Sequence, residues 1–319
     1  MTIKKNKIQK ETTTKEVVGV DNSSTPAVSF TRSPKQKSIR NAKILGNTFT
    51  YVILVLAAAV VVAPLLIVLM NSFKTKNSIA LEPFVFPTSK TFAGFNNYIT
   101  GVKQSNFFSS FLNSLLITIC STVLILIFCP MAAWFLTRVK TWWTKVIYYV
   151  IIFSMIVPFQ MVMLPLTGVA STLNLDNVIG VIFIYVGFGA GLSTFMYAGF
   201  VKSVPVDIEE SAMIDGCNPV QTFFHVVFPV MKPTTITIAI LNVMWIWNDY
   251  LLPYMVLGTT KGKTTLPVAI QISMQGGYGD INMGAFMAMI VLTIIPVIVF
   301  YLFCQKYIIK GVIAGAVKG

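Results

Sequence analysis

The chain has 319 residues, of which 55% are hydrophobic and only 11% are charged. Soluble domains carry about 25% charged residues, so this composition excludes a chain built of water-soluble domains alone. The net charge of +13 does not indicate nucleic-acid binding, because the basic residues flank hydrophobic stretches and do not form a groove with interleaved aromatic residues.

Residues 1–47 form the first segment of the chain, and they are rich in Lys, Thr, Ser and Asn. They contain ten basic and three acidic residues and too few large apolar residues to build a core. We expect a basic, disordered cytoplasmic tail. It is too long and too polar for the start of a signal peptide, and no small-residue cleavage site ends the apolar run that follows.

Six long apolar stretches follow the tail, and each is long enough to cross about 30 Å of hydrocarbon as a helix. They cover residues 48–70, 110–136, 145–166, 178–200, 231–257 and 284–304. The predicted fold class is therefore all-α transmembrane, a polytopic subunit with six helices in a domain from 48 to 304. Lys and Arg favour the loops on the side of the termini, which places the N-terminus and the 305–319 tail in the cytoplasm.

Proline and glycine recur within these stretches. A proline inside a span either marks a kinked helix of a gated pathway or reflects ordinary membrane-helix composition, and both interpretations remain open. Gly187, Gly189 and Gly191 predict a face on which another helix packs closely. The prolines are Pro64, Pro130, Pro158, Pro253 and Pro296.

The loop at about 203–230, between the fourth and fifth spans, is too polar to cross a membrane. Its pattern predicts two short helices, the first over 206–214 and the second starting at Pro219 with Asn218 as N-cap; Asp215 and Gly216 form the turn between them. Four of the chain's 11 acidic residues lie in this loop, on the side enriched in basic residues, which predicts a surface that binds something other than lipid. They are Asp207, Glu209, Glu210 and Asp215.

This segment resembles the EAA loop of ABC importer permeases, whose pattern is Glu-Ala-Ala, three residues, Gly, nine residues, then Ile-x-Leu-Pro. Glu210-Ser211-Ala212, Gly216 and the run that ends at Pro229 match it, with Ser211 in place of the first alanine. Residues 247–250 (WNDY) and 311–319 (GVIAGAVKG) also resemble the maltose-type, MalG-like carbohydrate permeases.

The resemblance implies the type I ABC importer permease (MetI-like) fold, with a homologous MalF-like partner subunit, a cytoplasmic ATPase dimer and an extracytoplasmic sugar-binding protein. ATP and Mg would be used by the ATPase, and this chain would hold no cofactor. In that family the loop is a coupling helix that docks into the ATPase. The residues expected to contribute here are Glu209, Glu210, Ser211, Ala212, Asp215, Gly216, Pro219 and Pro229.

Polar and aromatic residues near the end of the fifth span form a second candidate site. Trp245, Asn248 and Asp249 are expected to line a pathway or gate, because an ionisable group inside a span usually faces a cavity or a partner. The structural alternative is a carboxylate near the outer interface, hydrogen-bonded to Asn248 or Trp245. Trp245, Trp247 and Tyr250 also suit membrane-interface anchoring.

The outer segment 258–264 (GTTKGKT) has a weak likeness to a phosphate-binding loop. Its spacing is one residue short, and Leu266-Pro267 is not expected to start a helix, so no ATP site is predicted. The outer loop 258–283 is expected to reach the sugar-binding protein or to be a solvated connector.

An ion-coupled secondary transporter remains an alternative, resting on Asp249 alone. A membrane enzyme is disfavoured, because no paired carboxylates or nucleophile–base arrangement lie on one side of the bilayer. No catalytic residue is assigned, and His225 is expected to be a contact residue. The four cysteines have no metal-binding spacing and predict neither a zinc site nor disulfides.

Overall fold

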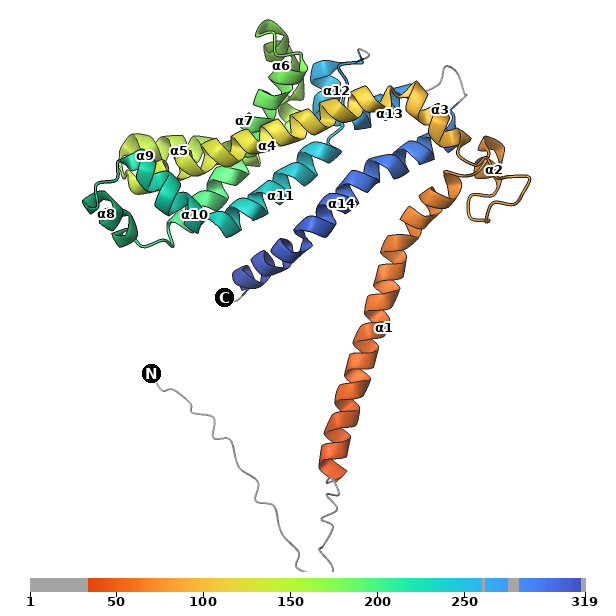
Figure 1. Ribbon diagram of the computed structural model, residues 1–319, viewed down its shortest axis with the longest axis horizontal. Helices are drawn as coiled ribbons and strands as arrows, with labels where there is room; N and C mark the ends of the chain where they lie inside the picture. Colours follow the sequence, from red (N-terminus) through yellow and green to blue (C-terminus); the bar gives the residue numbers. More distant parts are fainter. Residues whose placement is uncertain (1–33, 260–261, 275–280, 317–319) are drawn as a thin grey trace, which may run out of the picture. The chain divides into compact units, whose positions relative to one another are not determined.

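The computed structural model describes residues 34–259, 262–274 and 281–316, and its regular elements there are helices (Figure 1). Residues 1–60 and 61–319 form two separate units. The elements are α1 (Pro34–Asn71), α2 (Lys76–Leu81), α3 (Asn96–Gln104), α4 (Phe107–Arg138), α5 (Trp142–Ile156), α6 (Phe159–Thr172), α7 (Val178–Val201), α8 (Asp207–Ile214), α9 (Pro219–Thr222), the π-helix η1 (Phe223–Val227), α10 (Phe228–Val230), α11 (Lys232–Asn248), α12 (Leu251–Leu257), α13 (Leu266–Met274) and α14 (Met283–Ala316).

Four helical segments of the described chain are long and apolar enough to cross a membrane: Asn47–Asn71, Phe107–Arg138, Val178–Val201 and Met283–Tyr307. Two bent helix pairs raise the number to six if each pair counts as one span. The all-α, multi-pass class predicted from the sequence is therefore confirmed. Up to six spans, as predicted, are therefore present, and two of the six predicted stretches are interrupted within their length.

The third predicted span, 145–166, is broken. Helices α5 and α6 meet at an angle of 107°, and the two residues between them, Val157 and Pro158, are both extended. A residue before proline is disfavoured in the helical region, and proline itself provides no N–H for the helix ladder. Apolar composition runs through this break, so hydropathy alone did not indicate it.

The fifth predicted span, 231–257, is also interrupted. Helix α11 ends at Asn248, and Asp249 is extended before α12 begins at Leu251. The Asp249 carboxylate accepts the amide of Leu251 at 3.0 Å. A short polar side chain that bonds its own backbone competes with helix continuation, which accounts for the break. Before α11, the segment Pro219–Val230 lies at 77° to it.

The ends of the chain are more helical than predicted. Helix α1 begins at Pro34, so residues 34–47 are not a disordered tail, and α14 continues past Cys304 to Ala316. Proline suits the first helical position, and the Lys, Gln and Arg residues that follow are good helix formers. Residues 1–33 and 317–319 lie outside the described residues.

The core of residues 61–319 is formed mainly by α4 packed along α7, with α5 and α11 against them. The buried face of α4 is rich in small hydroxyl residues, and Ser121 Oγ donates to the carbonyl oxygen of Ile182 at 3.3 Å. Lipid tails are as apolar as the side chains, so helices in a membrane associate through close packing. Small side chains permit that packing because they let two backbones approach each other. The buried hydroxyl residues are Ser110, Ser114, Thr118, Ser121 and Thr122.

The predicted glycine face of α7 divides into separate contacts. A Cβ on Gly189 would lie 2.5 Å from Ile125 Cδ1 and 2.9 Å from Asn242 Oδ1, and one on Gly191 would lie 2.9 Å from Ser154 Oγ. A Cβ on Gly187 would meet nothing within 4 Å. Close packing is therefore confirmed for Gly189 and Gly191, while Gly187 needs no such explanation.

Gly189→Ala is expected to lower the free energy of unfolding by about 1–3 kcal/mol, because the added methyl group overpacks the contact between α4, α7 and α11. Thermal unfolding of the purified chain in detergent measures the change. Gly187→Ala is the matched control in the same helix, and its stability should stay within about 0.5 kcal/mol of the parent. Equal destabilisation by both variants would contradict this packing.

Candidate functional site

The loop between α7 and α11 folds as a helical hairpin, which we call the 207–230 hairpin. Its first helix is α8, and its second half comprises α9, η1 and α10. Asn218 caps α9 as predicted: its Oδ1 accepts the amide of Gln221 at 2.9 Å, and Gln221 Oε1 accepts the amide of Asn218 at 2.9 Å. This reciprocal capping box, followed by Pro219 at the first helical position, fixes where the second half begins.

The turn of the hairpin depends on Gly216. Its φ is +90°, in the region that favours glycine. The amide of Cys217 donates to Ala212 O at 3.0 Å, and the amide of Gly216 donates to Met213 O at 3.1 Å. These two bonds form a Schellman motif, which ends α8 and turns the chain toward α9.

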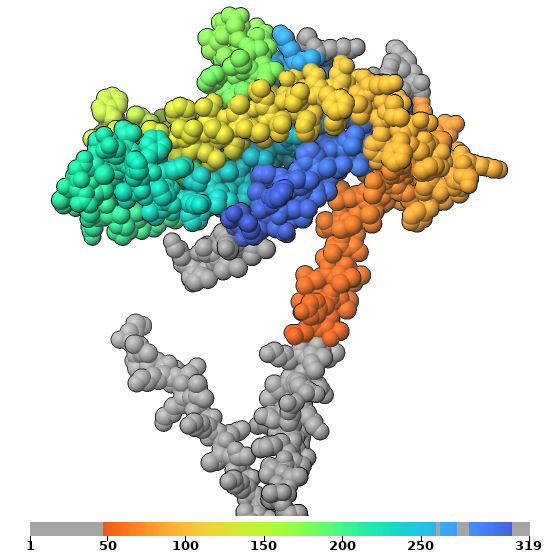
Figure 2. Space-filling view, viewed as in Figure 1, coloured from red at the N-terminus to blue at the C-terminus, as the bar shows by residue number. Residues whose placement is uncertain are grey.

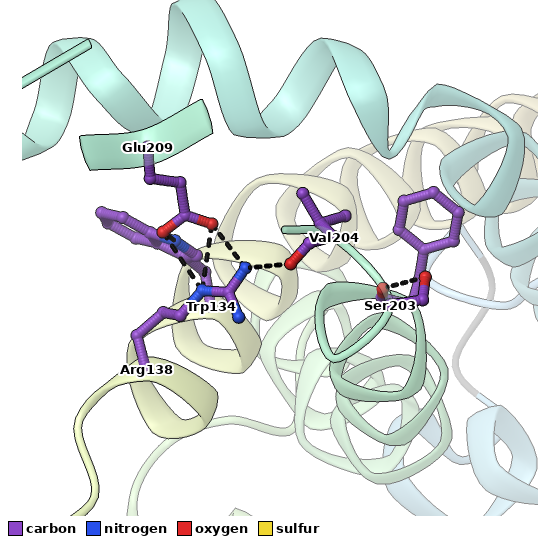
Figure 3. A network of polar contacts seen from close by, with 6 residues as sticks. Trp134, Arg138, Ser203, Val204 and Glu209 are labelled. Atoms are coloured by element: carbon purple, nitrogen blue, oxygen red, sulfur yellow. Dashed lines mark hydrogen bonds and ion pairs between the residues drawn. The ribbon is translucent and has the colours of Figure 1, made fainter. Parts of the chain in front are cut away.

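Glu209 is buried inside the hairpin and is not part of its outward surface, unlike most of the other residues predicted to contribute to this loop. Its side chain is 4% exposed and pairs with Arg138 at the end of α4, with Nη2 and Oε1 2.6 Å apart (Figure 3). Arg138 Nε lies 3.0 Å from Oε1, and Trp134 Nε1 donates to Oε2 at 2.9 Å. The carboxylate thus receives charge-assisted bonds from a span.

Arg138 and Trp134 also connect α4 to other parts of the hairpin region. Arg138 Nη2 donates to Val204 O at 2.9 Å, in the segment between α7 and α8. The rings of Trp134 and Phe223 lie 5.6 Å apart, so the same turn of α4 contacts η1. The end of one span therefore contacts both halves of the hairpin.

The outward surface of the hairpin carries most of the other predicted contact residues. Glu210, Ser211, Asp215, Gly216, Pro219 and Pro229 are exposed, together with Asp207 and His225. Ile214 is 86% exposed and Val220 60% exposed, so the surface combines carboxylates with apolar side chains. Ala212 is buried and packs within the hairpin. In Figure 2 the hairpin, in teal, forms a continuous surface next to the yellow atoms of α4.

The π-helix η1 is a feature that the sequence analysis missed. The amide of Phe228 donates to Phe223 O, one residue farther back than in an α-helix. Pro229 follows directly and has no N–H to donate, so the ladder is already incomplete at this point. Single-turn π-helices occur often at functional sites. The signal for it was the proline of the EAA pattern.

The second candidate site lies at the opposite end of α11 from the hairpin. Seventeen residues of helix separate the two sites, roughly 25 Å at the standard rise. Asp249 Oδ2 accepts the hydroxyl of Tyr185 in α7 at 3.0 Å, and Oδ1 accepts the amide of Leu251. The predicted partners Asn248 and Trp245 are wrong: Asn248 Nδ2 donates to Met244 O, and Trp245 packs edge-on against Tyr185 at 5.4 Å.

A cavity of about 300 Å³ adjoins this second site. Asn248 and Tyr250 line it together with Gln271 of α13 and Thr293 of α14, and the remaining walls are apolar. Trp245 and Asp249 do not line it. The structure thus divides the three predicted pathway residues: Asn248 faces a cavity, while Asp249 holds the junction between α11 and α12 to α7.

The segment that resembled a phosphate-binding loop leads into a helix, contrary to the prediction. Helix α13 begins at Leu266, whose amide donates to Ser114 Oγ of α4 at 2.8 Å. Leu266 is fully buried and Thr264 and Thr265 are buried beside it, so this helix start packs against α4. Part of the predicted outer loop 258–283 is therefore core; residues 260–261 and 275–280 lie outside the described residues.

Comparison with known proteins places the chain in a family. Residues 128–314 match the model of the binding-protein-dependent transport system inner membrane component family. The chain is 38% identical over 257 residues to the probable starch degradation products transport system permease protein AmyC of Thermoanaerobacterium thermosulfurigenes, covering 81% of this chain and 92% of the relative. It is 33% identical to the melibiose/raffinose/stachyose import permease protein MelC of Bacillus subtilis (strain 168), covering 84% and 96%.

A solved structure shares the fold. A chain of a bacterial ABC transporter involved in the import of the acidic polysaccharide alginate superposes with a TM-score of 0.62 at 24% identity, covering 89% of this chain and 99% of that one. The predicted MetI-like permease architecture is thereby confirmed. The chain belongs to the family of binding-protein-dependent transport system inner membrane components.

Proposed function

We propose that this chain is the permease subunit of an ATP-driven importer for a sugar or oligosaccharide. It would form the translocation pathway with a homologous permease partner. The observation that carries the proposal is family membership together with relatives whose names specify starch degradation products and melibiose, raffinose or stachyose as transported material. The binding protein and the pathway of the assembled complex would determine which sugar is carried.

The 207–230 hairpin is the proposed contact with a separate cytoplasmic ATPase dimer. Its outward surface offers Glu210, Ser211, Asp215 and Pro219 to a partner, while Glu209 and Ala212 stay inside. Because Glu209 is bonded to Arg138 and Trp134, movement imposed on the exposed surface is passed to α4. ATP and Mg would be bound and used by the ATPase, and this chain would transmit the conformational change.

The proposed orientation places the hairpin end of the molecule in the cytoplasm, with both termini. Lys140, Lys145 and Lys202 lie at this end, next to the ends of α4 and α7. Enrichment of basic residues on the cytoplasmic side supports this orientation. The opposite end, with α13, would face an extracytoplasmic sugar-binding protein; the related alginate transporter was crystallised with its periplasmic protein.

The proposal is tested in vesicles that contain the complete transporter with its ATPase and binding protein. Sugar uptake should need ATP, be blocked by vanadate and persist when a protonophore collapses the proton gradient. The matching sugar, supplied with the binding protein, should stimulate ATP hydrolysis. Uptake that continues with vanadate but stops with the protonophore would instead identify an ion-coupled carrier and overturn the proposal.

A further inference from the structure

A basic pocket at the ends of α4, α5 and α7 is separate from both candidate sites. Its volume is about 290 Å³, close to the lower end of small-molecule sites, about 300–1,000 Å³. Three lysines and two tyrosines line it, with aliphatic and threonine side chains between them. The lysines are Lys140, Lys145 and Lys202, and the tyrosines are Tyr148 and Tyr149.

Within the described part of the chain, the three ammonium groups of this pocket have no carboxylate counterion. Among residues 47–259, 262–272 and 281–307, no carboxylate lies within ion-pair distance of these lysines, and Glu209 of the hairpin is paired with Arg138. Lys202 Nζ instead lies 5.4 Å from the ring centre of Tyr148. Like charges gathered without a counterion repel one another, and an anion in the pocket relieves that repulsion.

The backbone around the pocket is firmly held. Thr141 and Thr144 form a capping box at the start of α5, and Thr144 Oγ1 also donates to Val139 O at 2.6 Å. Lys145, Tyr148 and Tyr149 then follow at helical spacings of three and four residues, which bring them to one face. Lys202 caps the end of α7. The lysines therefore converge from the connection between α4 and α5, from the first turn of α5 and from the end of α7.

The surroundings of the pocket are typical of the membrane–water boundary. Spans α4 and α7 end beside it, at Arg138 and Val201. Trp142 and Trp143 are 64% and 67% exposed at the start of α5, as in the aromatic belts of membrane proteins. Farther along α5, the apolar side chains of Ile147, Val150 and Phe153 are exposed.

We infer that this pocket binds the headgroup of an anionic phospholipid, with the phosphate between the three lysines and the acyl chains along α5. Basic pockets between spans on the cytoplasmic side are typical of sites for anionic headgroups. The phosphate supplies the missing counterion, and the two tyrosines that line the pocket can donate hydroxyl hydrogen bonds to the polar part of the headgroup. The bound lipid fixes the position of α5 against α7 beside the hairpin.

Native mass spectrometry of the full chain, purified in detergent and titrated with phosphatidylglycerol, tests the inference. One phosphatidylglycerol molecule should bind preferentially over phosphatidylcholine. A lysine near an anionic headgroup contributes roughly fivefold in affinity, so the triple variant Lys140→Gln, Lys145→Gln, Lys202→Gln should bind on the order of a hundredfold more weakly. Each single variant should lose about fivefold, which keeps the test decisive if the triple variant is unstable.

The matched control removes the same charge elsewhere: Lys90→Gln, Lys103→Gln, Lys263→Gln, all at exposed positions. It should keep its phosphatidylglycerol affinity within about twofold. Equal loss in both triple variants would reduce the effect to net charge and overturn the site. Displacement of the lipid by millimolar inorganic phosphate, with phosphate itself retained, would identify a free-anion site and overturn the lipid assignment.

Discussion

Arg138→Met is expected to lower the free energy of unfolding by about 3–5 kcal/mol and to abolish coupled transport. Removing one partner of a buried ion pair leaves the other charge uncompensated. Glu209 is 4% exposed, so its carboxylate would lose two nitrogen donors without gaining water. Thermal unfolding of the purified chain and sugar-stimulated ATP hydrolysis by the assembled complex are the two measurements.

A double-mutant cycle separates the ion pair from other effects of the substitution. Glu209→Gln retains an acceptor for Trp134 Nε1 but leaves Arg138 charged, so it should also destabilise the chain. The double variant Arg138→Met, Glu209→Gln carries neither charge and should be less destabilised than the sum of the single changes. Glu210→Gln, at the exposed neighbouring position, should leave stability unchanged. Strict additivity in the cycle would contradict the pairing.

Gly216→Val is expected to reduce sugar-stimulated ATP hydrolysis by between about fivefold and thirtyfold while membrane insertion stays normal. A residue with a side chain costs about 1–2 kcal/mol in the left-handed region, and that free energy corresponds to this range of populations. A Cβ at Gly216 meets nothing within 4 Å. The expected loss therefore comes from the backbone turn of the hairpin and not from a collision.

Two further variants control for this effect. Gly216→Asn should lose less activity, because asparagine enters the left-handed region more readily than valine. Gly199→Val places the same side chain at an exposed glycine of α7 whose φ is not positive and whose Cβ meets nothing within 4 Å. Activity of Gly216→Val equal to that of the parent, or equal losses at both glycines, would contradict a coupling role for the turn.

The hairpin could be predicted in detail because local chemistry determines it. Asn218 and Pro219 are a cap and a first helical residue in sequence alone, and Gly216 indicates a left-handed turn. What the sequence did not predict is that one residue of the hairpin pairs with a distant span: Glu209 and Arg138 are 71 positions apart. The available signal was an arginine in the last turn of a span, next to a loop rich in carboxylates.

The interruptions of the spans could not be read from hydropathy, since apolar residues continue through them. Pro158 provided a signal for the break between α5 and α6, but other prolines, such as Pro130 and Pro296, lie inside continuous helices. At Asp249 the deciding contact is the hydroxyl of Tyr185, 64 positions away. Such tertiary contacts decide between a kink, a break and an intact helix, and single-sequence patterns do not contain them.

We propose that the exposed surface of the 207–230 hairpin docks onto a cytoplasmic ATPase. Ile214 is 86% exposed on this surface and Leu81 is 82% exposed in α2 at the opposite end. In a background without the native cysteines, Ile214→Cys should react with a membrane-impermeant maleimide only in inside-out vesicles, and added ATPase subunit should protect it. Leu81→Cys should react only from the outside, with no protection. Labelling of Ile214→Cys from the outside, or labelling from the inside that the ATPase does not reduce, would contradict the account.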